Sequence, residues 1–248
     1  MKKLLLSALL AAFLHPAPSF AQLEYIVSPT VPKKFVVRTK KAIDRVERYF
    51  KREWGYQLNV PVKVILSDSE AFLKPYGGGR SNGNECYGGF ARPRQLVLCT
   101  EVDGFKRSSF DVIEIQKGIT AHEFAHLVQF EVTRGNMRPA WMIEGFAEFV
   151  FFDLIPNSTR IDRTKTIQNW KKTVRNVGPL QSLEGFDAVN TVENAYTKSF
   201  LAVRDLEKQH GMDAIRSYFE LLGRGMRWQT AFEQSFNQSP AAFYNAFE

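Results

Sequence analysis

The order of apolar and polar positions divides the chain into a first part with strands and a second part made of helices. Apolar residues alternate with others at Val62, Val64 and Leu66, which predicts a strand over residues 60–66. Two short apolar runs around an Arg-Pro-Arg turn predict a hairpin, and an early helix is expected over residues 38–54. The later helices are expected over residues 192–209, 212–222, 228–236 and 240–247. The pattern therefore predicts an α+β fold, with a sheet lobe over about residues 22–135 and a helical lobe over about residues 136–248.

A further helix, at the end of the sheet lobe, carries the pattern with the clearest chemistry. Phe124, Leu127 and Val128 form an apolar stripe that can pack on the core, while His122 and His126 face the opposite side. Because residues four apart share one helical face, both imidazoles can bind a single ion at about 2.1 Å. The segment His-Glu-Phe-Ala-His therefore predicts a catalytic zinc site. The alternative is that the same letters arise by chance on an ordinary helix.

A catalytic zinc needs a third protein ligand and an open position for water. Glu144 is the best candidate, because the 17 residues between it and His126 allow one helix to end and a second to return antiparallel from about Pro139. Glu148 lies one turn further on the same face and could hydrogen-bond a ligand histidine. Glu123 lies beside the metal rather than on it, where a carboxylate can take the proton from zinc-bound water.

These motifs resemble those of the gluzincin metallopeptidases, and within them the peptidase MA-like family. The similar segments are His-Glu-Phe-Ala-His and the following Pro-Ala-Trp-Met-Ile-Glu-Gly-Phe-Ala-Glu, which matches the pattern Trp-x-x-Glu-Gly-x-Ala. The resemblance implies a zincin-like fold, one Zn²⁺ held by His122, His126 and Glu144, and Glu123 as the catalytic base. It also implies that a strand just before the helix of the two histidines edges the cleft and pairs with the substrate, and the predicted hairpin occupies that place in the chain.

The segment Ala-Tyr-Thr-Lys-Ser-Phe around Tyr196 is similar to the Tyr-x-Lys-Gly segment of gluzincin aminopeptidases. The tyrosine hydroxyl of those enzymes stabilises the oxyanion, and the resemblance gives Tyr196 the same role, although Ser199 stands in place of the glycine. The alternative is a half-buried tyrosine on a helix whose same face carries Phe200, Val203 and Leu206. The sequence lacks the aminopeptidase signature Gly-x-Met-x-Asn, so aminopeptidase activity is not implied.

The first residues have the pattern of a signal peptide. Lys2 and Lys3 precede an apolar run at residues 4–14, and the small residues Ser19 and Ala21 occupy the two positions that signal peptidase recognises. We expect cleavage after Ala21, which leaves residues 22–248 as a single metallopeptidase domain in a secreted or periplasmic protein. The apolar run is too short to span a bilayer, and no membrane anchor is expected after processing.

Composition adds two expectations. The two cysteines, Cys86 and Cys99, would form a disulfide across the hairpin in an exported protein, the alternative being two unpaired buried thiols. The formal net charge of +7 is moderate and fits a soluble surface, the alternative being attraction to an anionic cell-envelope surface. The sequence has no nucleic-acid-binding motif and no nucleotide fingerprint, so no nucleic-acid partner is expected.

The leading hypothesis is an exported zinc-dependent metallopeptidase that acts on a peptide or protein substrate, with endopeptidase action favoured. One alternative is a non-catalytic envelope binding protein whose zinc site is vestigial or structural. Another is a zinc hydrolase of a non-peptide amide, since the same activated water attacks either bond. The sequence makes no prediction of the oligomeric state.

Overall fold

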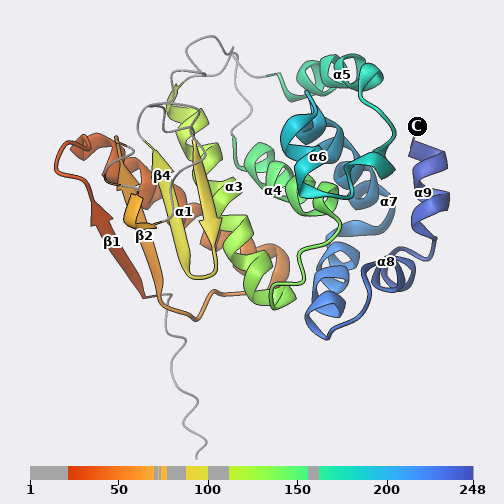
Figure 1. Ribbon diagram of the computed structural model, residues 1–248, viewed down its shortest axis with the longest axis horizontal. Helices are drawn as coiled ribbons and strands as arrows, with labels where there is room; N and C mark the ends of the chain where they lie inside the picture. The colour runs from red at the N-terminus through yellow and green to blue at the C-terminus, as the bar shows by residue number, and fades with distance from the viewer. Residues whose placement is uncertain are drawn as a thin grey trace, which may run out of the picture.

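The computed structural model describes residues 22–69, 72, 74–76, 88–99, 112–155 and 162–247. Within these residues a small sheet lies with α1 and α3 on one side of the molecule, and the helices from α5 onward form the other side (Figure 1). This arrangement agrees with the predicted α+β class and its small sheet lobe. The predicted signal peptide, residues 1–21, lies outside the described residues, as does Cys86.

The sheet has four strands in the order β1-β2-β4-β3. They are β1 (Leu23–Val27), β2 (Val62–Ser67), β3 (Gly89–Arg92) and β4 (Gln95–Cys99). The pairs β1 with β2 and β2 with β4 are parallel, and β3 with β4 is the predicted antiparallel hairpin, with Gly89 opposite Leu98 and Arg92 opposite Gln95. Strand β1 was not predicted from the sequence. Among the described strands, β3 forms the edge of the sheet next to β4.

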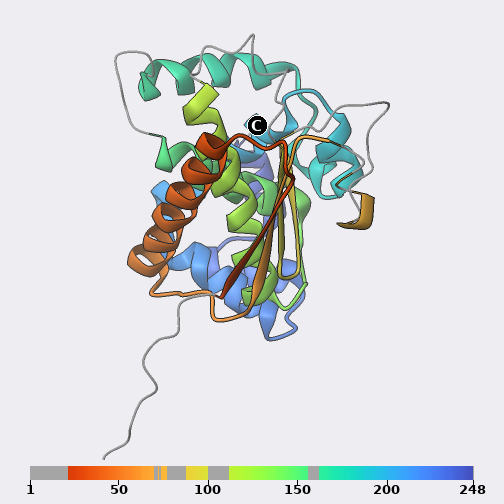
Figure 2. The same ribbon diagram turned by 90° about the vertical axis from the view of Figure 1, so that its left-hand side faces the viewer.

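Successive side chains of each strand point to opposite faces of the sheet. Val64 and Leu96 belong to the main core with residues of α1 (Lys33–Trp54) and α3 (Val112–Thr133). Ile65 and Val97 belong to a smaller cluster on the other face. Figure 2 shows the sheet close to edge-on, with α1 on one side of it. Helix α1 begins directly after Pro32, five residues before the predicted start, because Phe35 and Val36 also pack against the core.

The chain reverses after α3 at Arg134 and Gly135, both with positive φ, and enters α4 (Ala140–Leu154) after Pro139. This is the predicted turn between two helices. Helix α4 is buried over most of its surface, because it packs against both α3 and the long helix α7 (Ala195–Gly223). Predicted helices 192–209 and 212–222 correspond to the two helical parts of α7, which a kink at Gly211 separates, because the φ of 79° and ψ of 168° at this glycine are not helical.

The remaining helices surround α4 and α7. Helices α8 (Trp228–Phe236) and α9 (Pro240–Phe247) have the predicted bounds, whereas α5 (Arg163–Thr173) and α6 (Phe186–Thr191) were not predicted. Short 3₁₀ segments cover Lys74–Tyr76, Val174–Asn176 and Leu180–Leu183. The main core runs through both lobes, from Phe50 of α1 through Phe146 of α4 to Phe219 of α7. Within the described part of the chain, no helix has both the length and the apolar character that a membrane span requires.

Candidate metal centre

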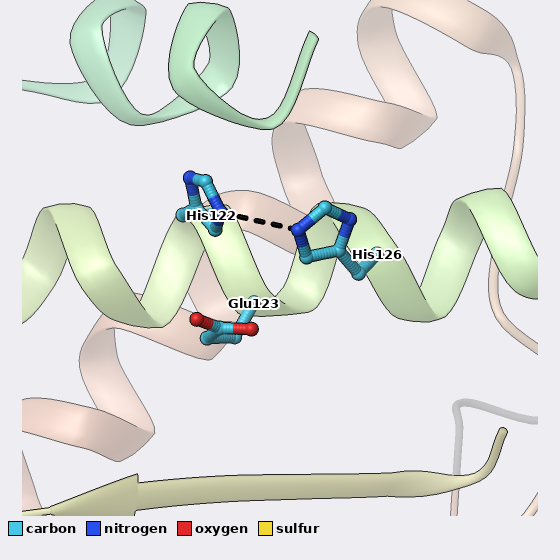
Figure 3. Close-up of side chains that lie close together, drawn as sticks. All are labelled: His122, Glu123 and His126. Atoms are coloured by element: carbon cyan, nitrogen blue, oxygen red, sulfur yellow. Dashed lines mark hydrogen bonds between the residues drawn. The ribbon is translucent and has the colours of Figure 1, made fainter. Parts of the chain in front are cut away.

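Helix α3 presents His122 and His126 toward α4 because its other face belongs to the core. Phe124, Leu127 and Val128 are almost fully buried in that core, as their predicted stripe requires. The imidazoles lie one turn apart with 3.1 Å between their Nε2 atoms. Figure 3 shows them on one side of α3 and the Glu123 carboxylate on another.

Glu144 completes a triangle of ligand-type atoms with the two histidines. Its Oε2 lies 3.3 Å from Nε2 of His122 and 3.3 Å from Nε2 of His126. In a tetrahedral zinc site with ligands at about 2.0–2.1 Å, neighbouring ligand atoms are about 3.3–3.4 Å apart. The three atoms therefore have the spacing of one face of such a tetrahedron. The same Oε2 is buried without a hydrogen-bond partner among the described residues, which fits an atom that serves as a metal ligand.

Glu123 fits the ligand set less closely than Glu144. The ligand-type atoms of His122, Glu123 and His126 lie within 4.8 Å of one another, a looser group than the 3.1–3.3 Å triangle with Glu144. The Glu123 carboxylate thus lies next to the triangle rather than in it.

Each histidine is oriented through its second ring nitrogen. Nδ1 of His122 lies 3.1 Å from Oε1 of Glu148, the contact that the sequence suggested. Nδ1 of His126 lies 2.7 Å from Oε1 of Gln129. With Nδ1 donating to these oxygens, each Nε2 keeps its lone pair for the triangle.

Gln129 belongs to the site but was not predicted from the sequence. It is fully buried, and its Nε2 donates to the carbonyl oxygen of Ile143 at 2.9 Å. One side chain thus connects His126 on α3 with the backbone that immediately precedes Glu144 on α4. Its position three residues after His126 is the only sequence signal for this contact, and the partner on α4 appears only in three dimensions.

Three carboxylates around two buried imidazoles dominate the electrostatics. Burial raises the pKa of Glu123, and the nearby histidines only partly oppose this. Burial would also raise the pKa of Glu144, but His126 and His122 outweigh it and hold that pKa well below its usual range. Burial lowers the pKa of His122, yet the neighbouring carboxylates of Glu144 and Glu148 raise it overall, and Glu144 has the same effect on the pKa of His126. The site therefore favours a cation.

Tyr196 lies at the start of α7 and reaches the same site. Its ring centroid is 6.1 Å from that of His122, and its hydroxyl donates to Oδ1 of Asn190 at 2.8 Å. Burial and the charges of Glu144 and Glu123 raise the pKa of the Tyr196 phenol, so the hydroxyl stays protonated and remains a donor.

Gly145 allows α7 to come this close to α4. A Cβ at this position would clash with the backbone carbonyl of Ser199 and would lie 2.9 Å from Cγ2 of Val203. The glycine beside Glu144 thus lets the backbone of α7 lie directly on α4, which brings Tyr196 to the triangle.

The hairpin lies against the other side of the site. A Cβ at Gly89 of β3 would lie 3.1 Å from Cγ of Glu123 and 2.7 Å from the carbonyl oxygen of Val97. The edge strand therefore runs directly past Glu123. Cys99 ends β4 in a buried position, and its disulfide with Cys86 stays a prediction because Cys86 is outside the described residues.

Comparisons with known proteins support the fold. No family model matches the chain, and no curated protein does. Among solved structures, it is similar to an M1 zinc metallopeptidase from Deinococcus radiodurans, at 15% identity and a TM-score of 0.53, over 92% of this chain and 47% of that one. A mutant of the same peptidase gives 16% identity and a TM-score of 0.54 over 92% and 48%, and a two-domain M1 peptidase mutant bound to L-arginine gives 16% and 0.54 over 92% and 47%.

The chain spans about half the length of these solved proteins. At this level of identity the similarity shows a shared fold, and that fold is the one in which M1 zinc metallopeptidases are built.

Proposed function

We propose that this protein is a zinc-dependent metallopeptidase that hydrolyses peptide bonds. The observation that carries the proposal is the triangle of His122 Nε2, His126 Nε2 and Glu144 Oε2, with the Glu123 carboxylate beside it. Such a set provides three ligands and leaves a fourth position open, which is the arrangement of catalytic rather than structural zinc. The similarity in fold to solved M1 zinc metallopeptidases supports the same conclusion.

In this proposal His122, His126 and Glu144 hold the metal, and Glu148 and Gln129 orient the two imidazoles. Bound zinc would supply a lowered pKa for an attacking water and would polarise the carbonyl of the substrate. Glu123 accepts the proton from the water and passes it to the leaving amine nitrogen. Its carboxylate lies beside the triangle rather than in it, so it is free to take up and return the proton.

Tyr196 acts on the other side of the reacting carbonyl. Before the substrate arrives, its protonated hydroxyl donates to Oδ1 of Asn190, which positions the phenol. In the reaction the same proton turns to the oxygen that becomes negatively charged. The edge strand β3, next to Glu123, pairs with the main chain of an extended substrate. Recognition of extended main chain rather than of a chain end favours endopeptidase action.

We further propose that the signal peptide is cleaved after Ala21, that the mature protein is exported, and that it carries the Cys86–Cys99 disulfide. The basic start, the apolar run and the small residues of the first 21 positions support this location. Mass spectrometry of the protein purified from its native cells tests it through the N-terminal residue and the mass of the peptide that contains the disulfide.

Glu123→Gln tests the function directly. The mature protein is loaded with zinc, incubated with a complex peptide mixture and analysed by mass spectrometry for new peptide ends. We expect the variant to bind zinc with the same stoichiometry and to cleave about 10²- to 10⁴-fold more slowly. Glu131→Gln on the same helix is the matched control, since Glu131 is half-buried, lies 3.9 Å from Arg94 and makes no contact with the triangle.

Full activity in Glu123→Gln would refute the mechanism. Zinc binding without cleavage by the wild type would instead favour the non-peptide amide hydrolase or the binding protein. Cleavage by the wild type and the Glu131→Gln control alone would establish the peptidase and reveal its preference for internal or terminal bonds.

A further inference from the structure

A second concave site lies on the helical lobe, away from the metal centre. It is a cavity of about 430 Å³ between α5, α7 and the end of α9, which lie together on one side of the molecule (Figure 1). Five basic residues line it: Lys171, Arg175, Lys198, Arg204 and Lys208. We call this cavity the basic pocket.

The basic pocket is distinct from the metal centre because α7 separates the two. Tyr196 and Lys198 are two positions apart on this helix, which places them about 200° apart around its axis. Tyr196 faces His122, and Lys198 therefore faces away from the metal centre and into the pocket. The inference does not rest on the proposed peptidase activity.

Charge in the basic pocket is strongly one-sided. Among the described residues that line it, Asp205 is the single acidic one, and its Oδ2 accepts a hydrogen bond from Gln209 at 2.7 Å. Elsewhere on the surface, basic residues pair with nearby carboxylates, as Arg52 does with Glu53 at 2.6 Å and Arg216 with Asp213 at 3.1 Å. A concave surface lined by one sign of charge concentrates ligands of the opposite sign.

Four of the basic residues have no carboxylate at ion-pair distance within the described part of the chain: Lys171, Arg175, Arg204 and Lys208. They come from both walls, Lys171 and Arg175 from the end of α5 and the 3₁₀ turn after it, and the other two from α7. Converging cations repel one another, so the arrangement favours a bound anion that neutralises several of them at once.

Lys198 gives the basic pocket a fixed floor. Only 4% of this residue is exposed, and its Nζ donates to the carbonyl oxygen of Gly178 at 2.8 Å and lies 5.9 Å above the ring of Phe247. These contacts connect α7 with the segment after α5 and with α9, the three parts that form the cavity. The pocket is thus held by buried contacts and does not depend on long exposed side chains alone.

We propose that the basic pocket binds a phosphate-bearing anion with two or more negative charges. Arginine offers paired N–H donors and lysine a compact charge, the two groups by which proteins hold phosphate oxygens. The cavity has room for two or three phosphate groups, and Val174, Leu201 and Phe247 provide an apolar wall for a small organic part. The source of the phosphate is either a soluble compound or the headgroup of an anionic phospholipid.

Calorimetric titration of the full protein with tripolyphosphate at about 0.15 M salt tests the soluble source. Sedimentation with phosphatidylglycerol vesicles, compared with phosphatidylcholine vesicles, tests the headgroup. The pocket variant combines Arg175→Gln, Arg204→Gln and Lys208→Gln, three residues whose side chains are exposed or half-exposed. The matched control combines Lys34→Gln, Lys41→Gln and Arg48→Gln, which removes the same charge from exposed positions of α1.

We expect saturable binding of one of the two probes by the wild type and the control, and binding weaker by about tenfold or more in the pocket variant. Equal weakening in both variants would overturn the proposal, because net charge alone would then explain the binding. Absence of saturable binding of either probe would also overturn it. Thermal unfolding of all three proteins checks that they are folded, and the single variant Lys208→Gln repeats the comparison if the triple pocket variant is not.

Discussion

Replacing Gln129 with methionine isolates the contact between the two helices that carry the proposed ligands. Methionine has a similar length and volume but cannot replace the amide, so the packing is kept while both hydrogen bonds are lost. One of them, of 2.7 Å, orients His126, and the other, of 2.9 Å, reaches the carbonyl of Ile143. The carbonyl keeps its place in the α4 helix, so the main loss falls on the buried Nδ1 of His126.

Two magnitudes follow from this geometry. A buried donor without a partner costs about 1–3 kcal/mol, which we expect as the loss in the free energy of unfolding of the metal-free Gln129→Met protein. Loss of a group that orients a metal-ligating histidine weakens metal binding by about 10- to 100-fold. We therefore expect a lower zinc affinity as well as a lower stability.

The assays are zinc competition against a chromophoric chelator and urea unfolding in excess chelator. Gln116→Met is the matched control, because Gln116 is a buried glutamine of the same helix whose amide donates to Phe35 O at 3.0 Å and to Thr39 Oγ1 at 3.1 Å. Both variants should lose stability, and only Gln129→Met should lose zinc affinity. Equal zinc affinity in Gln129→Met and the wild type would refute the role of this contact.

Three further predictions concern other parts of the chain. Tyr196→Phe should keep its zinc and lose about 10²- to 10³-fold in kcat, as expected for one missing donor to the oxyanion, and an unchanged kcat would restrict Tyr196 to packing. Gly145→Ala should destabilise the protein by about 1–3 kcal/mol in urea unfolding, because its Cβ clashes with Ser199 on α7, and an unchanged stability would contradict the close approach of the two helices. The hydrogen bonds from Thr30 and Ser28 hold the pKa of Asp68 below its usual value, so this carboxylate stabilises the fold above about pH 4 and loses that effect as the pH falls through its folded pKa. Asp68→Asn should then show a smaller drop in urea midpoint between pH 7 and acidic pH than the wild type. An identical drop would show that the Asp68 carboxylate does not contribute to this pH dependence.

The elements predicted correctly are those that short stretches of sequence define. The hairpin follows from two apolar runs around a tight turn, and α8 and α9 follow from helical periodicity bounded by polar residues. Strand β1 was missed because five residues carry little pattern, and its place depends on parallel pairing with β2 some forty residues later. Helix α5 was missed because it is mostly polar and buries one residue, Ile167.

In the candidate site, too, some residues could be predicted from the local sequence and others could not. The spacing of His122 and His126 on one helix is visible in the sequence, and Glu144 follows from the return of the chain as a second helix. Gln129 looks like an ordinary polar residue until α4 is placed beside it, since its second partner belongs to that helix. The approach of Tyr196 likewise requires the packing of α7 on Gly145, which no local pattern reports.

The location of the triangle on consecutive helices also bears on the order in which the molecule assembles. His122, His126 and Glu144 all belong to α3 and α4, which a short turn connects, so the chain closes only a small loop to bring them together. Tyr196 arrives with α7, which must first dock against α4. A refolding chain can thus bring the three proposed ligands together as a helical hairpin before α7 docks, and Tyr196, the proposed oxyanion donor, joins them afterwards.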